Sequence, residues 1–326
     1  MSRADGCCTA SGAGFAALYN VPAPAKVNWF VHVLGRRADG YHDLQTVFQF
    51  IDWCDWLDFE RRDDGVISRE GGDGLPAEDL SVKAARLLQT HSGCRFGVHI
   101  RLRKAIPAEA GLGGGSSDAA STLLALNLIW GLGLRRAQLM DLALGLGADV
   151  PVFVFGRNAF AQGVGEQLAA VELPAWSLLV GWPGTGLSTT AMFGSHLLTR
   201  NTPAETISSF AESLKSAKGA RAGTVEPAEC DDAGLARRLG LEYGHNDLQP
   251  VAIAALPEIG ALADWLKART GSGFVAMSGS GSAMFAPCDP SVEFGHVAMA
   301  PAWKVRKCRA LLGHPLLAWA SDRQQE

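Results

Sequence analysis

A cluster of glycines that runs directly into a long helical pattern constrains this chain more than any other feature. Residues 107–122 read Pro-Ala-Glu-Ala-Gly-Leu-Gly-Gly-Gly-Ser-Ser-Asp-Ala-Ala-Ser-Thr. The four glycines in 111–115 lack a Cβ atom, so the backbone there can adopt positive φ and direct several N–H groups at one anion. A helix that starts near Ser116 would add the positive end of its dipole. The pattern therefore predicts a phosphate-binding loop.

The two common phosphate fingerprints do not fit this loop. A P-loop requires Lys after its last Gly, where this chain has Ser116. A Rossmann fingerprint requires a third Gly or Ala, and after Gly111-x-Gly113-x-x the chain again has Ser116. The loop is therefore predicted to belong to a third class of nucleotide or phosphate binder.

Length and charge limit the possible partners. The chain has 326 residues, which is long enough for two domains with separate cores. Its net charge of −4 gives no general attraction to nucleic acid or anionic lipid, so we expect phosphate binding to be local and expect no nucleic-acid partner. The longest apolar stretch, residues 123–134, is too short to span a bilayer, so we expect no membrane partner.

The cysteine content and residues 1–20 indicate the cellular compartment in which the protein is expected to act. The seven cysteines are odd in number and include no Cys-x-x-Cys pair, which predicts reduced thiols in a cytoplasm rather than a disulfide framework or a zinc site. Residues 1–20 carry one Arg and no sustained apolar core, so they predict a flexible tail rather than a signal peptide. Import of the protein into an organelle is the alternative.

Hydrophobic periodicity predicts that the chain contains both strands and helices. Alternation over residues 26–34 indicates a strand that places Lys26 and Asn28 on the same face. Asp149 precedes a proline by two residues, a placement typical of a helix N-cap. The other elements expected in the first half are a turn at 36–42, a strand at 46–59, a helix at 80–89, a strand at 98–103, helices at 117–130 and 136–146, and a strand pair at 159–171.

Pro174 marks the predicted boundary between two domains, at 21–174 and 175–326. A new apolar strand follows over 176–182, and 252–270 indicates a helix. Residues 215–233 are rich in small and charged residues and are predicted to be a mobile insertion. A second glycine-serine turn, 277–285, enters an apolar strand.

Three blocks in the right order resemble the GHMP kinases, small-molecule kinases related to galactose, homoserine, mevalonate and phosphomevalonate kinases. They are Pro24-Ala-Lys-Val-Asn28, residues 107–120 and Ser278-Gly-Ser-Gly281. Four further blocks resemble the subgroup that phosphorylates 4-diphosphocytidyl-2-C-methyl-D-erythritol: residues 38–42, 44–46, 147–151 and 246–248. The resemblance covers roughly residues 21–290.

The resemblance implies a two-domain α+β fold, with an N-terminal mixed α/β domain, a C-terminal ferredoxin-like domain and the active site in the cleft between them. It implies transfer of the ATP γ-phosphoryl group to the 2-hydroxyl of the cytidyl-linked methylerythritol, a step in isoprenoid precursor synthesis. Mg²⁺ is expected with ATP, because the phosphates need charge neutralisation during transfer, but no protein ligand for it is evident. The partner is thus a small cytidyl-diphosphate substrate, and the chain is expected to be a monomer or a homodimer.

The resemblance makes Lys26 and Asp149 the catalytic residues. A carboxylate beside a hydroxyl can accept its proton, and phosphoryl transfer otherwise requires mainly alignment and charge stabilisation. A cation near Asp149 would steady the developing alkoxide and orient the acceptor. It would also make the carboxylate a weaker base, so we expect orientation to matter more than full deprotonation. The alternatives are a helix cap for Asp149 and a surface position for Lys26.

The ATP site that the resemblance implies centres on the glycine loop, with Ser116 and Ser117 supplying hydroxyls to phosphate or a metal. Its alternative is a turn whose glycines only permit close packing. Asp79 replaces the Asn that usually contacts adenine in relatives, which makes the match at the adenine pocket weaker. Glu109 adds negative charge beside an anion site and is expected to weaken ATP binding unless it turns outward or contacts a metal. The implied ATP-binding residues are Asp79, Lys104, Pro107, Gly111, Leu112, Gly113, Gly114, Gly115, Ser116 and Ser117.

Aromatic rings are implied on the acceptor side, because they can sandwich a pyrimidine while backbone groups bind its edge. Tyr41, His42 and Phe193 would hold cytosine, with Thr189 nearby and Asn28 hydrogen-bonded to substrate. Core packing is the alternative for each ring. Two other functions stay open: another GHMP small-molecule kinase, of mevalonate or sugar type, and a nucleotide-binding regulator without catalysis.

Overall fold

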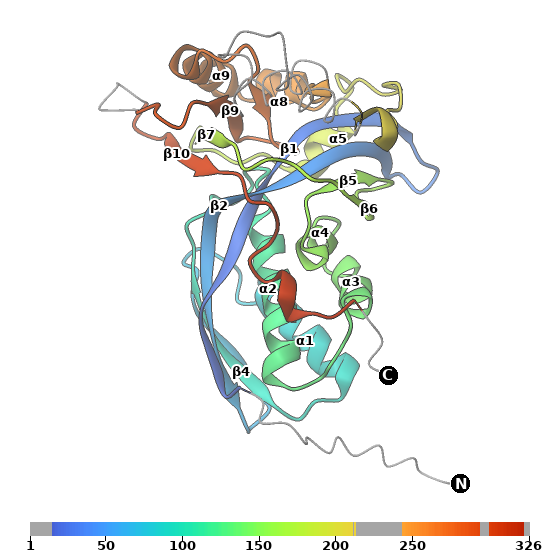
Figure 1. Cartoon of the computed structure of the whole chain (residues 1–326), viewed down its shortest axis with the longest axis vertical. Helices are drawn as coiled ribbons and strands as arrows, with labels where there is room; N and C mark the ends of the chain where they lie inside the picture. The colour runs from blue at the N-terminus through green and yellow to red at the C-terminus, as the bar shows by residue number, and fades with distance from the viewer. Residues whose placement is uncertain (1–14, 211, 213–242, 294–299, 323–326) are drawn as a thin grey trace, which may run out of the picture.

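The computed structural model describes residues 15–210, 212, 243–293 and 300–322 (Figure 1). The predicted insertion at 215–233 lies outside these residues. The fold has two sheets with helices packed on each, so the predicted α+β class is confirmed. None of the described helices is both long and apolar enough to cross a membrane.

The first sheet has six strands in the order β3-β4-β2-β5-β6, with β1 paired to β2. β3 and β4 are parallel, and the other pairs are antiparallel. The short strand β3 was not expected from the sequence. The strands are β1 (Ala17–Arg36), β2 (His42–Arg62), β3 (Ile67–Gly71), β4 (Gly97–Arg103), β5 (Ala159–Gln162) and β6 (Gln167–Ala170).

The β1–β2 hairpin runs through both halves of the molecule (Figure 1). Its turn closes where predicted: Asp39 Oδ1 accepts the N–H of Tyr41 at 3.1 Å, and Gly40 has φ +89°. β1 begins at Ala17, so its first residues lie in the range predicted as a tail. The hairpin carries Lys26 and Asn28 on one buried face, which places them under the glycine loop.

Four helices cover one face of the first sheet (Figure 1). Nearly every residue of α2 is buried, polar ones included, because protein surrounds this helix. α2 begins at Gly114, slightly before the predicted start near Ser116. The helices are α1 (Leu80–Ser92), α2 (Gly114–Ile129), α3 (Arg136–Leu144) and α4 (Val150–Phe155).

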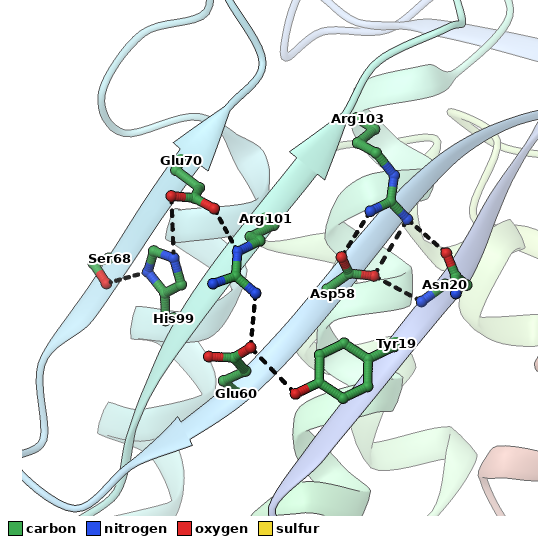
Figure 2. A network of polar contacts seen from close by, with 9 residues as sticks. All are labelled: Tyr19, Asn20, Asp58, Glu60, Ser68, Glu70, His99, Arg101 and Arg103. Atoms are coloured by element: carbon green, nitrogen blue, oxygen red, sulfur yellow. Dashed lines mark hydrogen bonds and ion pairs between the residues drawn. The ribbon is translucent and has the colours of Figure 1, made fainter.

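The opposite face of this sheet carries a network of charged side chains (Figure 2). Arg101 bridges Glu60 and Glu70 across three strands, with N–O distances of 2.7 and 2.5 Å. Arg103 pairs with Asp58 at 2.7 Å. Polar alternation on strands β2 and β4 therefore separates a solvated face from the face that packs on the helices.

The second sheet has the order β10-β7-β9-β8 and is antiparallel throughout. In chain order these strands are fourth, first, third and second, as in a ferredoxin-like domain. Its elements are β7 (Ser177–Trp182), α5 (Thr189–Gly194), α8 (Gln249–Ala255), α9 (Glu258–Thr270), β8 (Ala276–Met277), β9 (Met284–Cys288) and β10 (Lys304–Arg309).

The prediction of one helix over 252–270 is wrong, because the segment holds the end of α8 and all of α9. Leu256 has φ −143° and ψ 89°, which is outside the helical region. The residue before a proline is disfavoured in the helical conformation, and Pro257 follows Leu256 directly. The helix therefore breaks at this pair.

After β10 the chain returns to the first half of the molecule, where η3 (Leu317–Trp319) lies beside the helices (Figure 1). The buried guanidinium of Arg136 on α3 donates to the carbonyls of Val154, Leu317 and Ala320 at 2.5–2.8 Å. Residues 310–322, within the range predicted as the second domain, thus pack on helices of the first.

We expect Arg136→Met to lower the free energy of unfolding by about 3 kcal/mol, because it leaves three buried or partly buried carbonyl groups without their donor. Urea denaturation would measure the change. Arg135→Met is the matched control, since the Arg135 side chain bonds only locally, to Gln138. Equal effects of the two substitutions would contradict the role assigned to Arg136.

Candidate functional site

The backbone carbonyl oxygens of the glycine loop are directed at neighbouring segments of the protein and away from the predicted anion site. All four carbonyls of residues 109–112 are bonded to neighbouring segments. Their donors are the N–H groups of Leu187, Ala283 and Lys26, the hydroxyl of Ser278 and the ammonium of Lys26, at 2.8–3.1 Å. Among the described residues, no backbone carbonyl receives the N–H of Gly111, Leu112 or Gly113. The loop therefore offers N–H groups, which suits an anion.

Two of the glycines are required by the backbone. Gly111 and Gly113 both have φ +72°, where a side chain is strained. A Cβ on Gly111 would lie 2.0 Å from the carbonyl oxygen of Ser278, and one on Gly113 would lie 2.8 Å from Phe153 Cζ. Gly113 is also the N-cap of α2, so the helix dipole points at the loop as predicted.

Lys26 and Asp149 form an ion pair next to this loop, with 3.3 Å between Nζ and Oδ2. The ammonium also donates to Asn28 Oδ1 at 2.6 Å and to the Gly111 carbonyl at 3.0 Å. Three acceptors thus surround the three N–H groups of Lys26, whose side chain is only 2% exposed. The alternative that Lys26 is an ordinary surface lysine therefore does not fit this buried, hydrogen-bonded ammonium.

Asp149 stands at the N-cap of α4, but its side chain makes no capping hydrogen bond. It reaches Lys26 instead and is 40% exposed. The capping alternative therefore does not account for this carboxylate. The arrangement leaves Asp149 accessible to a hydroxyl group while Lys26 fixes one of its oxygens.

Asn28 connects this pair to the strands. Its Nδ2 donates to Thr46 Oγ1 at 2.8 Å, and Thr46 Oγ1 donates to the Phe30 carbonyl at 2.6 Å. Its Oδ1 already accepts from Lys26. In this structure the amide of Asn28 thus orients Lys26, while the residue also lines the cavity described below.

Lys104, at the end of β4, lies between two buried carboxylates. Its ammonium bonds to Asp55 Oδ2 and to Asp118 Oδ2, the latter at 2.7 Å. Burial raises the pKa of Asp118 to about 7, against the opposing effect of Lys104. Burial by itself lowers the pKa of Lys104, but the two carboxylates outweigh it and raise that pKa above its ordinary value.

A cavity of about 690 Å³ joins these features. Its size suits a nucleotide together with an acceptor. Of the residues predicted for the site, thirteen line it: Lys26, Asn28, Asp79, Lys104, Pro107, Gly111, Gly113, Gly114, Gly115, Ser116, Asp149, Thr189 and Phe193. Segments from both halves of the chain therefore meet at one space.

Four predicted residues do not line this cavity. Leu112 is buried, and its carbonyl holds the N–H of Lys26. Ser117 is buried within α2, and its hydroxyl has no partner among the described residues. Tyr41 is 64% exposed on the hairpin turn, and His42 lies behind Phe193.

Of the two departures noted in the sequence, Asp79 has a structural role through its side chain, whereas the contact of Glu109 is made by its backbone. Asp79 caps α1 by accepting the Val82 N–H at 3.0 Å and pairs with Arg69 at 3.2 Å. Glu109 has φ +50°, and its carbonyl accepts the Leu187 N–H at 3.1 Å. Both residues also line the cavity.

The acceptor side has an aromatic pair. The rings of His42 and Phe193 stack with 5.1 Å between centroids. Arg200 Nε donates to His42 Nε2 at 3.2 Å, so this nitrogen is the acceptor and the neutral ring carries its proton on Nδ1. Burial, with Arg200 and Arg36 nearby, lowers the pKa of His42. Thr189 contacts Ser280 at 2.8 Å between the hydroxyl oxygens.

Sequence reasoning missed Thr46, Asp55 and Asp118 as contributors to this site. Asp118 belongs to the glycine block and could have been found there. Asp55 lies in strand β2 together with other acidic residues, among them Asp52 and Asp58, so its place in the sequence does not single it out. Its partner lies 49 positions away, so the pairing could not be read from spacing.

Comparison with known proteins agrees with this geometry. Family models of the GHMP kinases N terminal domain and the GHMP kinases C terminal region match residues 79–157 and 228–295. A 4-diphosphocytidyl-2-C-methyl-D-erythritol kinase of Verminephrobacter eiseniae is 50% identical over 315 residues, which is 94% of this chain and 99% of that protein. The chain belongs to the GHMP kinase family.

Two further relatives are similar along most of their length. A protein of Cupriavidus necator with the same kinase name is 47% identical over 307 residues, covering 93% of this GHMP kinase and 96% of the relative. The crystal structure of a 4-(cytidine 5'-diphospho)-2C-methyl-D-erythritol kinase is 35% identical, with a TM-score of 0.63 over 82% of this chain and 89% of that one.

The loop geometry predicts opposite effects for two Gly→Ala substitutions in this kinase. Gly113→Ala should lower the free energy of unfolding by about 2 kcal/mol, because Ala is strained at positive φ and its Cβ would overlap Phe153. Gly115→Ala should raise it by about 0.5 kcal/mol, since this helical position has only Leu80 Cδ1 nearby, at 3.4 Å. Thermal and urea unfolding would measure both. A stable Gly113→Ala protein would contradict the strained geometry.

Proposed function

We propose that this GHMP kinase transfers the γ-phosphoryl group of ATP to the 2-hydroxyl of 4-diphosphocytidyl-2-C-methyl-D-erythritol. The observation that carries the proposal is the Lys26–Asp149 pair, which opens onto the same cavity as an anion-binding loop. The chemistry of phosphoryl transfer requires those two parts side by side. The names of the relatives support the choice of acceptor.

In this proposal Asp149 binds the acceptor hydroxyl. One carboxylate oxygen is held by Lys26, which leaves the other to accept the hydroxyl proton as the oxygen attacks phosphorus. Lys26 is itself fixed by Asn28 and Gly111, so its charge stays near the developing alkoxide without reorganisation. Alignment and fixed charge supply most of the rate enhancement.

The glycine loop and the start of α2 would hold the ATP phosphates through backbone N–H groups. Among the described residues there is no group of three or more His, Cys, Asp or Glu side chains placed to hold a metal ion. Asp55 and Asp118 already bind Lys104. An Mg²⁺ ion bound with ATP would neutralise charge on the transferring phosphoryl group.

The cytosine would bind at the His42–Phe193 pair, with the exposed ring of Tyr41 beside it. A neutral His42 presents an N–H donor at Nδ1, and its lowered pKa favours this neutral form. Cys54 and Cys308 are free thiols, which fits a reducing cytoplasm. The chain would act there as a monomer or a homodimer.

Two alternatives have weaker support. Another acceptor, such as a mevalonate or a sugar, would have no use for the aromatic pair on the acceptor side. A regulator without catalysis would not need the buried Lys26 to be paired with an accessible Asp149. Both alternatives are outcomes of the experiments below.

Asp149→Asn should reduce kcat about a hundredfold to ten-thousandfold, because the amide cannot accept the hydroxyl proton. A coupled ADP-release assay with ATP and the cytidyl substrate would measure it. Asp141→Asn, on the exposed face of α3, is the matched control and should leave kcat unchanged. Full activity of Asp149→Asn would remove Asp149 from the mechanism.

The choice of acceptor is tested by the same assay with a panel of hydroxyl compounds. We expect turnover with 4-diphosphocytidyl-2-C-methyl-D-erythritol and none with mevalonate, galactose or homoserine. Mass spectrometry of the product would locate the phosphate on the 2-hydroxyl. Turnover of another panel member alone would overturn the acceptor, and no turnover with ATP binding intact would favour the regulator.

A further inference from the structure

The carboxylates of Asp55 and Asp118 bind the ammonium of Lys104 from two different elements, β2 and α2. The Asp55 side chain is fully buried, and that of Asp118 is 3% exposed. Lys104 is 19% exposed and lines the cavity, as does Asp118. The cluster therefore forms part of the cavity wall, with its cation at the surface and one carboxylate fully behind it.

The same cluster ties down both ends of the glycine loop. Asp55 Oδ1 accepts the N–H groups of Ala105 and Ile106, at 2.5 and 2.9 Å, where the chain leaves β4. Asp118 lies in the first turns of α2, where the loop ends. One ammonium thus connects the segment before the loop to the helix after it. Displacing Lys104 would disturb the loop at both junctions.

The charges in the cluster do not balance when Asp118 is ionised, above its raised pKa. Two carboxylates face one ammonium, and Asp118 Oδ1 has no partner among the described residues. A second buried carboxylate costs free energy that a neutral side chain would avoid, so stability alone gives little reason for it. Two of the three N–H groups of Lys104 are used within this cluster, and a third can point into the cavity.

We propose that Asp55 and Asp118 are positioning residues that hold the Lys104 ammonium at the cavity wall, so that its remaining N–H group meets ATP. The inference rests on the proposed function, since it requires the cavity to bind ATP. It gives the two carboxylates a role in ATP binding that is separate from the roles of the glycine loop and of the Lys26–Asp149 pair. Their effect would appear in nucleotide affinity and not in the rate of the chemical step.

Asp118→Asn and Asp55→Asn test this inference because, at a pH above the raised pKa of Asp118, each removes one charge and keeps the shape. In Asp55→Asn, the amide oxygen can still accept the N–H groups of Ala105 and Ile106. We expect each variant to weaken binding of a non-hydrolysable ATP analogue about tenfold, as for one lost charge-assisted bond. The KM for ATP should rise equally, with kcat and the KM of the acceptor within about twofold.

Asp58→Asn is the matched control. Asp58 lies on the same strand and also pairs with a basic residue of β4, Arg103, but on the outer face of the sheet (Figure 2). Its substitution should leave nucleotide affinity unchanged. If Asp118→Asn and Asp55→Asn bind the analogue as well as Asp58→Asn does, the inference is overturned, whatever their effect on the unfolding midpoint.

A double-mutant cycle with Lys104→Met separates positioning from a general structural effect. If Asp118 acts through Lys104, Asp118→Asn should add no further loss of affinity to Lys104→Met. Additive losses would show that Asp118 acts independently and would contradict the inference. Calorimetric titration with the analogue needs no acceptor, so these results stand apart from whether the cytidyl compound is the substrate.

Discussion

The buried ammonium of Lys26 is the interaction on which the rest of the site depends. A charge in the protein interior is tolerated only when it is paired and hydrogen-bonded. Lys26 has three such acceptors: Asn28, two residues further along the same strand, the loop carbonyl of Gly111 and the carboxylate of Asp149. Satisfying this one group brings the β1 strand, the glycine loop and the start of α4 together. The catalytic geometry follows from that requirement.

The glycine loop joins the two halves of the chain in a similar way. Its carbonyls are bonded to β1 on one side and to the segments at Leu187 and Ala283 on the other. A backbone whose carbonyls are all engaged outward has only its N–H groups left for a ligand. The anion site is therefore a product of contacts behind the loop, and the C-terminal residues that return to α3 hold the same two halves at a second place.

Local patterns were enough to predict the order of most elements and the residues around the loop, whereas the α+β class was implied by the resemblance to GHMP kinases. Glycine at positive φ and a helix start are properties of neighbouring residues, so 111–115 could be interpreted directly. The helix break at Pro257 was also available in the sequence, yet apolar periodicity outweighed it in the prediction. Strand β3 is short and half-buried, and its pattern was too weak to detect.

By itself, the sequence determined which atoms could do the chemistry: a phosphate-binding loop, a lysine, a carboxylate and a set of aromatic rings. Tertiary structure decided which of them meet. It directed Asp149 to Lys26 instead of to its own helix, stacked His42 on Phe193, and paired Lys104 with Asp55 and Asp118. The physical reason is that these partners lie far apart along the chain, and a buried charge requires a partner that only the folded chain can place beside it.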